Sequence, residues 1–464
     1  MSRNLRKFDS VEAYENYRST DGWVYPAVNV IENEVETQVH YNNELRMRWY
    51  DADTAKTPTF SGDISHDQFK AWVDAASHPC EIKKDLTGFN YLKMSGNNVA
   101  DFTLLSTGAA SHYNTDDKND YFQMTEVHNV NVGLFQNSTE GWKEVRFNFD
   151  KGCPTGFHKW FAHPYWNATL KDPITGKNGV WTKLLGRYDV TPTLVEGTTA
   201  GTTVDIAYGC SQGGYNVNNW SANLILQKLK ATHSTALLSM TYWEHLVLTY
   251  IFSAYYKTFD HQSIFNGLLT DYTNNSGGWT NGQTDTILTP HGGLTKLANG
   301  NQAYKFMHME NSHYGKQWIW GAGFVGDANV SPSKWYMTFD DIVANKTATM
   351  ARTDADIVTT SSIAAEQGQY INKIDLWGVP QSASGGSSST GFYDGLWVSA
   401  NSSRVAWLGG NSNNGAIDGG FARNFNNDAA NSNWNRRCRE LIGNHISLCS
   451  GVCLRSKSCS SVGK

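Results

Sequence analysis

Residues 407–435 read WLGGNSNNGAIDGGFARNFNNDAANSNWN and depart sharply from the composition of the rest of the chain. Nine of the 25 residues from 411 to 435 are Asn. An Asn side chain both donates and accepts hydrogen bonds and tolerates left-handed turns, so a dense set makes a polar surface without net charge. Aromatic and Arg side chains lie in or beside the run, among them Trp407, Phe425, Trp434, Arg423, Arg436 and Arg437. The pattern favours a recognition surface over a Gly/Asn-rich loop that merely connects strands.

The overall composition suits an exposed protein. The chain has 464 residues, with 43 acidic and 38 basic side chains and a formal net charge of -5. This balance lacks the positive field that nucleic-acid binding requires, so no nucleic-acid partner is expected. Charged residues make up only 17%, against roughly 25% in an average soluble protein, and aromatic residues make up 13%. A surface of this kind suits contact with a receptor or a glycan, although aromatic-rich β domains in general share it.

Neither export by a secretory signal nor membrane insertion is expected. The N-terminal residues 1–17 include basic side chains but no apolar core of the length that a secretory signal has. The most apolar stretch, 236–256, carries Glu244 and His245 at its centre, which is costly in a membrane. We expect residues 237–256 to form a buried amphipathic helix. Its apolar stripe recurs at steps of three and four residues: Trp243, Val247, Tyr250, Ile251 and Ala254.

The N-terminal part of the chain is predicted to be a small attachment module. Helical spacing at 8–18 and 66–76, with Ser65 as the cap of the second helix, accompanies two short strands at 23–32 and 37–42. Residues 97–120 are polar and rich in Gly, Ser, Asn and Asp, and are the best candidate for a boundary loop. We place the module at 1–110, the main domain at 111–443 and a tail, expected to be disordered, at 444–464.

Strand-like runs open the main domain. Residues 121–135, 142–150 and 158–166 have the alternation of half-buried β-strands, and 271–300 and 382–391 read as surface loops. Together with the long helix, these runs predict an α+β fold.

No catalytic or metal site stands out in the sequence. The histidines form loose pairs (His158 and His163, His245 and His261, His308 and His313), but none fits a zinc-protease motif, and no phosphate-binding loop or nucleophile elbow is present. Seven cysteines are unevenly spaced, which favours free thiols over a disulfide framework; a zinc site at Cys449, Cys453 and Cys459 is a minor alternative. Asp340 and Asp341 are better explained by the first turn of a helix than by glycosidase chemistry. We expect no cofactor, no metal and no enzymatic activity.

Four stretches, taken in order, resemble one family. Residues 409–441, GGNSNNGAIDGGFARNFNNDAANSNWNRRCREL, resemble the C-terminal signature of C-type-lectin-fold variable proteins and tail-fibre proteins of gut-bacterial phages. Residues 237–267 are similar to the hallmark helix of these proteins, with Asp260-His261-Gln262-Ser263 at the place of an NSQ stretch. Residues 309–324, MENSHYGKQWIWGAGF, resemble a strand shared with the formylglycine-generating-enzyme branch of the fold, and 6–42 resemble the opening of gut-phage virion proteins.

The resemblance implies a C-type-lectin-like domain that displays ligand-contacting residues on a rigid scaffold. In relatives served by diversity-generating retroelements, Asn-rich C-terminal positions vary. By match to that motif, the variable candidates here are Asn411, Ser412, Asn413, Asn414, Asp418, Asn424, Asn426, Asn427, Asp428, Asn431, Asn433 and Asn435. Trp407, Arg423 and Trp434 complete the predicted ligand-binding set. The calcium tripeptides of animal C-type lectins and the paired cysteines of the enzyme branch have no counterpart, so neither calcium-dependent sugar binding nor that chemistry is implied.

The functional expectation is therefore a non-enzymatic phage virion protein. It would be made in the bacterial cytoplasm, join other tail proteins, trimerise as phage fibres usually do, and bind a bacterial surface receptor, either protein or glycan. Two alternatives stay open: a structural head or tail component without receptor binding, and a glycan-active depolymerase, which would need two carboxylates in a groove. A prophage or bacterial adhesin of the same fold has the same sequence features.

Overall fold

The computed structural model describes part of the chain, and the structural statements below concern these residues. These are 29–32, 35–38, 43–83, 89–112, 121–127, 130–148, 157–160, 165–166, 168–171, 178–181, 206–208, 237–239, 242–267, 284, 286–294, 303–315, 317–327, 334–337, 357–360, 366–375, 377–383, 386–398, 404–412, 414–428, 431, 436–437, 440–442 and 447–448.

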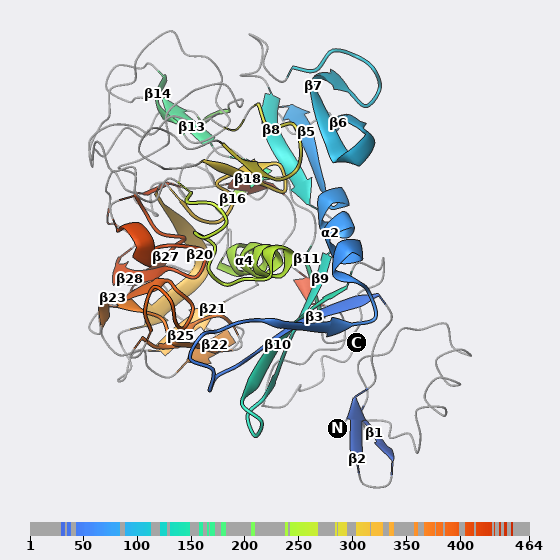
Figure 1. Cartoon of the computed structure of the whole chain (residues 1–464). Helices are drawn as coiled ribbons and strands as arrows, with labels where there is room; N and C mark the ends of the chain where they lie inside the picture. Colours follow the sequence, from blue (N-terminus) through green and yellow to red (C-terminus); the bar gives the residue numbers. More distant parts are fainter. Residues whose placement is uncertain are drawn as a thin grey trace, which may run out of the picture.

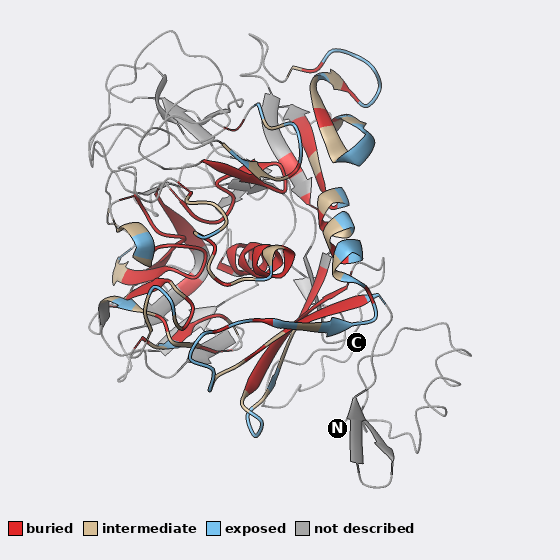
Figure 2. Ribbon diagram, viewed as in Figure 1, coloured by how far each residue is buried: buried red, intermediate tan, exposed pale blue. Residues whose placement is uncertain are grey.

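One helix lies at the centre of the described structure. Helix α4 (Tyr242–Tyr256) sits between an eight-stranded sheet on one side and helix α2 with the N-terminal strands on the other (Figure 1). Its described side chains are buried on nearly every face, including polar Thr249 and Ser253, and most of α4 is red in Figure 2. The expected burial is confirmed, and the stripe residues Val247, Tyr250, Ile251 and Ala254 belong to the hydrophobic core. The expected amphipathic character is wrong, because the polar side chains of the helix are buried as well. Residues 237–239, expected in the helix, form strand β16.

The eight-stranded sheet carries the C-terminal part of the chain. Its strands, in spatial order, are β22 (Ile357–Thr360), β21 (Lys334–Met337), β20 (Trp318–Asp327), β27 (Val405–Leu408), β28 (Arg423–Asn427), β26 (Gly395–Val398) and β23 (Glu366–Tyr370), with β29 (Arg436–Arg437) also on β20. The pairs β26–β28 and β20–β29 are parallel, and the other pairs are antiparallel.

Two further sheets join early strands to late ones. The six-stranded sheet contains, in order, β31 (Ser447–Leu448), β11 (Phe157–Trp160), β9 (Val130–Asn137), β10 (Trp142–Asn148), β3 (Glu44–Tyr50) and β4 (Thr59–Gly62). The seven-stranded sheet contains β16 (Leu237–Ser239), β30 (Glu440–Ile442), β12 (Tyr165–Trp166), β8 (Tyr121–Val127), β5 (Ser77–Lys83), β6 (Phe89–Ser95) and β7 (Val99–Leu105). The pairs β3–β10 and β5–β8 therefore carry hydrogen bonds across the expected domain boundary at residue 110.

Short strands make four smaller units. These are β1 (Asn29–Glu32) with β2 (Val35–Gln38); β14 (Asn178–Trp181), β13 (Ala168–Lys171) and β15 (Ile206–Tyr208); β17 (Gly292–Gly293), β18 (Tyr304–Phe306) and β19 (Met309–Glu310); and β24 (Lys373–Ile374) with β25 (Pro380–Ser382). Two single 3-10 turns, η1 (Gly96–Asn98) and η4 (Gly415–Ile417), also belong to the described residues.

Helix α2 (His66–Ala75) begins at the residue that the sequence predicts. The Ser65 hydroxyl accepts a hydrogen bond from the Gln68 backbone N–H (3.1 Å), and the Gln68 side chain accepts one from the Ser65 N–H (2.7 Å). This reciprocal pair satisfies two of the backbone donors that a helix N-terminus leaves open. Phe69 and Val73 are buried on one face, and the other face of α2 is exposed in Figure 2.

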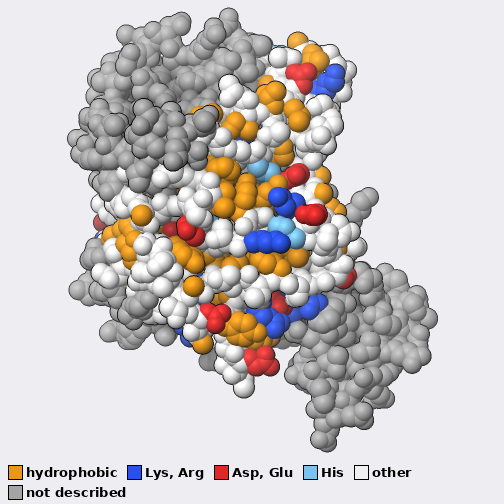
Figure 3. All heavy atoms as spheres, in the orientation of Figure 1, with side chains coloured by type: hydrophobic (Ala, Val, Ile, Leu, Met, Phe, Trp, Pro, Cys, Tyr) orange, Lys and Arg blue, Asp and Glu red, His pale blue; other side chains and the backbone are white. Residues whose placement is uncertain are grey.

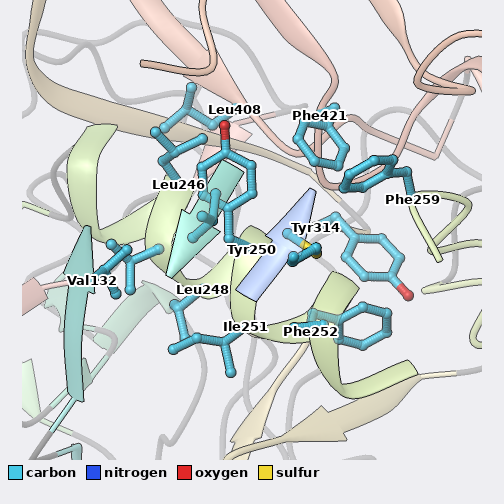
Figure 4. Packing of buried hydrophobic residues seen from close by; sticks show 14 of the residues in the cluster. Val132, Leu246, Leu248, Tyr250, Ile251, Phe252, Phe259, Tyr314, Leu408 and Phe421 are labelled. Atoms are coloured by element: carbon cyan, nitrogen blue, oxygen red, sulfur yellow. The ribbon is translucent and has the colours of Figure 1, made fainter. Parts of the chain in front are cut away.

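A single hydrophobic cluster unites the three large sheets and both helices. Figure 4 shows Tyr250 and Ile251 of α4 with Val132 of β9, Leu408 of β27 and other aromatic side chains around them. Tyr250 lies 6.0 Å from Phe421 and 5.9 Å from Trp49 between ring centroids. Aromatic pairs at such distances add stability beyond the area that they bury. The N-terminal and C-terminal strands therefore share one core.

The structure supports the α+β class, since mostly antiparallel sheets enclose two helices among the described residues. The strand-like runs from 121 to 166 contain the strands β8 to β12, as expected. The boundary loop at 97–120 is wrong in part, because β7 lies within it and pairs with β6. In the expected tail, β31 pairs with β11. The helix at 8–18 and the acidic pair at 340–341 lie outside the described residues.

Two other expectations concern the surface and the membrane. No helix among the described residues is long and apolar enough to cross a membrane. On the face drawn in Figure 3, small groups of acidic and basic side chains lie among uncharged polar and hydrophobic ones.

Candidate functional site

The C-terminal candidate residues divide into a buried group and a more exposed group. Six of them are at most 9% exposed: Trp407, Asn411, Ser412, Asp418, Arg423 and Asn424. Asn414, Asn426, Asn427 and Asn431 are half-buried, and Asp428 is exposed. Asn413, Asn433, Trp434 and Asn435 lie outside the described residues. Burial leaves the first group little surface for a ligand. Among the described candidates, the half-buried residues and Asp428 therefore offer the contact area.

The loop from 409 to 421 is held in shape by backbone contacts to carboxylates. Gly409 and Gly410 have φ values of 80° and 77°, a conformation that favours glycine. A side chain at Gly410 would lie 2.2 Å from the Cβ of Asp418, so the close approach also requires glycine. Asp418 accepts a hydrogen bond from the Asn411 N–H (3.0 Å) and closes the loop around η4. The two glycines and Asp418 thus build a tight turn.

A second carboxylate and a glutamine fix the same loop to its surroundings. Asp394, which precedes β26, accepts a hydrogen bond from the Phe421 N–H (2.7 Å). Gln262, in the segment that follows α4, donates from Nε2 to the carbonyl of Ala416 (3.0 Å) and to that of Asp418. Gln262 belongs to the Asp260–Ser263 stretch that stands at the place of the NSQ stretch in the phage proteins. Asp394 carries no sequence signal of its own.

Burial dominates the electrostatics of these carboxyl groups. It raises the pKa of Asp394 and of Asp418 well above the usual value, although each accepts a backbone hydrogen bond that acts in the other direction. Desolvation disfavours the charged form, and each of the two groups also has a neighbouring carboxylate that raises its pKa further. Both groups are 1% exposed or less, so they act on the loop and not on an external ligand.

Arg423 anchors the start of β28 from inside. Its Nη1 donates to the carbonyls of Gly420 (2.8 Å) and Ala422 (3.0 Å), and its guanidinium lies 5.3 Å from the centre of the Tyr242 ring. Trp407 packs edge-on against Trp320 at 5.2 Å between ring centroids, on the neighbouring strand. Two residues expected to touch a ligand therefore have structural contacts: Trp407 holds β27 to β20, and Arg423 holds the start of β28 to α4.

The more exposed candidates begin at Asn426, near the C-terminal end of β28. Asn424 Oδ1 accepts hydrogen bonds from the Asn426 N–H (3.0 Å) and from Asn427 Nδ2 (3.2 Å). One buried amide thus orders the next two Asn residues, which are half-buried. Asp428 follows with its carboxylate 4.0 Å from Arg404 Nη1. This segment presents amide groups at the C-terminal end of β28 and a carboxylate directly after it.

A chain of buried polar side chains lies directly behind this loop. Ser253 Oγ is 2.7 Å from His261 Nε2, His261 Nδ1 is 3.2 Å from His313 Nε2, and His313 Nδ1 is 2.8 Å from Ser312 Oγ. The fold brings together histidines that lie 52 residues apart, a proximity that the sequence does not reveal. All four side chains are fully buried, and burial lowers the pKa of His261 to about 3. Among the described residues no cluster of His, Cys, Asp or Glu is arranged to hold a metal ion.

Comparisons with known proteins add no relative. No protein-family model matches the chain, and no curated protein matches it. The functional inference consequently rests on the order of the sequence motifs and on the geometry of residues 404–431.

Proposed function

We propose that the chain is a phage virion protein of the tail that binds a receptor on the host-cell surface. The four sequence stretches that resemble gut-phage proteins, in their order along the chain, support the phage assignment. The low fraction of charged side chains and the absence of a basic excess suit contact with a surface receptor. The C-type-lectin-like character of the domain is part of this proposal.

The C-terminal end of β28 carries the receptor-binding part of the proposal. Asn426 and Asn427 are half-buried, and their positions are set by the buried Asn424 amide and by the anchored start of the strand. Preorganised polar groups lose little conformational entropy on binding, and amides adapt to either donors or acceptors on a partner. Side chains on such a base can change without loss of the fold, which is what variation at a receptor site requires.

The proposed contact set is smaller than the sequence alone suggests. It comprises the exposed and half-buried candidates Asn414, Asn426, Asn427, Asp428 and Asn431, and it retains Asn413, Asn433, Trp434 and Asn435 from the sequence motif. If the chain assembles as a trimer, three weak sites would act together and gain avidity from their effective concentration.

Cell binding by the full chain tests the proposal. Fluorescently labelled protein would be incubated with candidate gut-bacterial strains, beside a triple variant with Asn426→Ala, Asn427→Ala and Asn431→Ala. The control is Ser106→Ala with Thr107→Ala, which changes exposed residues next to β7. Circular dichroism would first establish that all three proteins have the same fold.

We expect the wild type and the control to bind at least one strain and the triple variant to lose most of that binding. Equal binding of all three proteins would contradict the site. Absence of binding to every strain would favour a structural virion component, and release of sugar from host capsule would favour a depolymerase. A genomic repeat that differs from the 411–435 codons only at adenines would identify diversification.

A further inference from the structure

One ion pair outside the 404–431 region joins two neighbouring strands at very short range. Lys143 on β10 lies opposite Trp49 of β3, and Asp51 directly follows the end of β3. Lys143 Nζ is 2.6 and 2.5 Å from the two carboxylate oxygens of Asp51. Ion pairs of this type ordinarily have N···O distances of about 2.7–2.9 Å. The Asp51 N–H also donates to the Gly141 carbonyl (2.9 Å), which fixes the backbone on both sides of the pair.

The two distances place the lysine nitrogen against the carboxyl carbon. The two oxygens of a carboxylate flank Cγ, so a nitrogen this close to both lies about 3 Å from Cγ or closer, at the near-attack separation of about 3–3.5 Å. Two groups held in this way react as if at a very high concentration, because the cost of bringing them together has been met by folding. The pair therefore has the proximity that amide formation requires.

The surroundings keep water from the nitrogen and leave room beside the carboxyl group. The Lys143 side chain is 6% exposed and the Asp51 side chain is 21% exposed. Burial of an ammonium is costly, and a lysine in a dry site is a strong nucleophile once it has lost a proton. Both residues line a cavity of about 320 Å³, which is large enough to receive a released water molecule.

Asp375, between β24 and β25, places a second carboxyl group beside the pair. It lines the same cavity. Its Oδ1 accepts hydrogen bonds from the N–H groups of Trp377 (2.8 Å) and Val379 (2.9 Å), whereas its Oδ2 is buried and has no hydrogen-bond partner among the residues that the structure describes. Burial raises the pKa of Asp375 to about 7, against the opposing effects of these two hydrogen bonds and of the Lys143 ammonium. Such a group both takes up and releases a proton at neutral pH.

We propose that Lys143 and Asp51 form an intramolecular amide bond, with Asp375 as the proton carrier. One proton passes from the ammonium to Asp375, and the Lys143 nitrogen then donates its electron pair to Asp51 Cγ. The bond from Cγ to one oxygen breaks, and this oxygen leaves as water with two protons from the nitrogen, one of them returned by Asp375. One ammonium and one carboxylate become one amide and one water molecule, without an oxidant or reductant and without a net change of charge.

Lys373 assists from the hairpin side of the carboxylate. Its Nζ lies 3.0 Å from Asp51 Oδ2, and its side chain is 43% exposed. An ammonium in this place stabilises the negative charge that develops on the carboxyl oxygens during attack. Lys373 contacts one oxygen only and is hydrated, so it is not the group that attacks. The bond would tie β10 to the end of β3 across 92 residues of chain, independently of the receptor-binding proposal.

Mass spectrometry of the purified full-length chain tests the proposal. The intact mass and the masses of proteolytic peptides would be measured for the wild type and three variants. Lys143→Arg keeps the positive charge but removes the primary amine, and Asp375→Asn keeps the shape of the side chain but cannot carry the proton. Lys373→Arg is the matched control, since it changes the other lysine on the same carboxylate. Circular dichroism would establish that the variants fold as the wild type does.

We expect the wild type to be lighter than its sequence mass by one water molecule and to yield a linked peptide pair that joins residues 51 and 143. The pair should be absent from Lys143→Arg and present in Lys373→Arg. Freshly made Asp375→Asn should contain little of it, because general acid–base catalysis typically contributes about 10²-fold or more to a rate.

The wild-type result decides the proposal by itself, even where a variant fails to fold. The proposal is overturned if the wild type yields only unlinked peptides, if Lys373 is the linked residue, or if the water is lost through a cyclic imide at Asp51 with Lys143 unmodified. A bond that forms equally fast in folded Asp375→Asn would overturn the role of Asp375.

Discussion

Gly420 occupies a position where His261 and His313 leave no space for a side chain. A Cβ there would lie 2.2 Å from His261 Nδ1 and 3.1 Å from His313 Cδ2. We expect Gly420→Ala to lower the free energy of unfolding by about 1–3 kcal/mol or more, because a packed core resists added volume. Urea denaturation measures this loss.

The matched change is Gly96→Ala, at an exposed position with no heavy atom within 4 Å of the new methyl group. It should leave the denaturation midpoint close to that of the wild type. Equal midpoints for the two variants would show that the loop around Gly420 moves away from the histidines at little cost.

His261 gives stability a defined pH dependence. Burial lowers its pKa from 6.5 to about 3 in the folded chain. Between pH 6.5 and 3, His261 therefore binds a proton in the unfolded chain but not in the folded one. The stabilising contribution is complete above pH 6.5 and is lost as the pH falls toward 3, at up to about 1.4 kcal/mol per pH unit. Between pH 6.5 and 5, His261→Gln should be less stable than the wild type but should show a shallower decline, measured by urea denaturation at each pH.

Other buried groups act in both directions in this window. Burial lowers the pKa of His291 and His308, which adds to the decline at low pH, whereas it raises the pKa of Asp394 and Asp418, which opposes it. These groups are common to both proteins, so the difference between the two curves isolates His261. Parallel curves would mean that His261 titrates alike in the folded and unfolded chain.

At the scale of elements, Gln262 links the segment after α4 to the loop that carries η4. Its amide donates to two carbonyls of that loop, at Ala416 and Asp418. We expect Gln262→Ala to speed hydrogen exchange of the backbone amides at 415–418 with little change in global stability. Mass spectrometry of exchanged peptides measures this effect.

Ser263→Ala serves as the control, since the Ser263 hydroxyl donates to the Asp260 carbonyl (2.7 Å) and not to the η4 loop. Exchange at 415–418 should stay at the wild-type rate in this variant. If both variants behave alike, the loop is held by Asp418 and Asp394 alone.

Local patterns in the sequence predict elements better than contacts between them. The cap at Ser65 and the helix that follows it depend on residues within one or two helical turns, and they are confirmed. The long helix is confirmed over 242–256, although 237–239 form a strand. The parallel pair β26–β28 is not predictable from such patterns, because Leu396 meets Arg423 only through the completed sheet. The expected boundary loop is wrong in part because β7 pairs with β6 despite its polar surroundings.

The candidate site shows the same limit. The composition of an Asn-rich run does not show whether its amides face solvent or close a turn. The burial of Asn411 and Asn424 can therefore not be predicted from the sequence. Their backbone and amide partners lie within seven residues, yet the burying surface comes from distant strands. That Asn426 and Asn427 contact a receptor stays a prediction.

At the scale of the whole molecule, the shared core ties the first 110 residues to the rest. Leu45, Met47, Trp49, Phe69 and Val73 belong to the same cluster as α4. We expect a chain of residues 111–464 to lose cooperative unfolding and near-ultraviolet circular dichroism, because it would expose the edges of β10 and β8 together with this core.

The matched truncation to residues 43–464 removes β1 and β2, which pair with each other in the described structure. This shorter chain should unfold cooperatively at nearly the wild-type midpoint. A cooperative 111–464 chain would instead support an independent domain that starts near residue 110.

The last strands have a consequence for how the protein is made. Three separate sheets receive β29, β30 and β31, all from residues 436–448. Until the ribosome has released these residues, their partner strands keep unpaired backbone groups; these are β20, β16, β12 and β11. Contacts over such sequence separations also form slowly. Native assembly of the three sheets therefore waits until residue 448 has left the ribosome, and the nascent chain is exposed to aggregation until then.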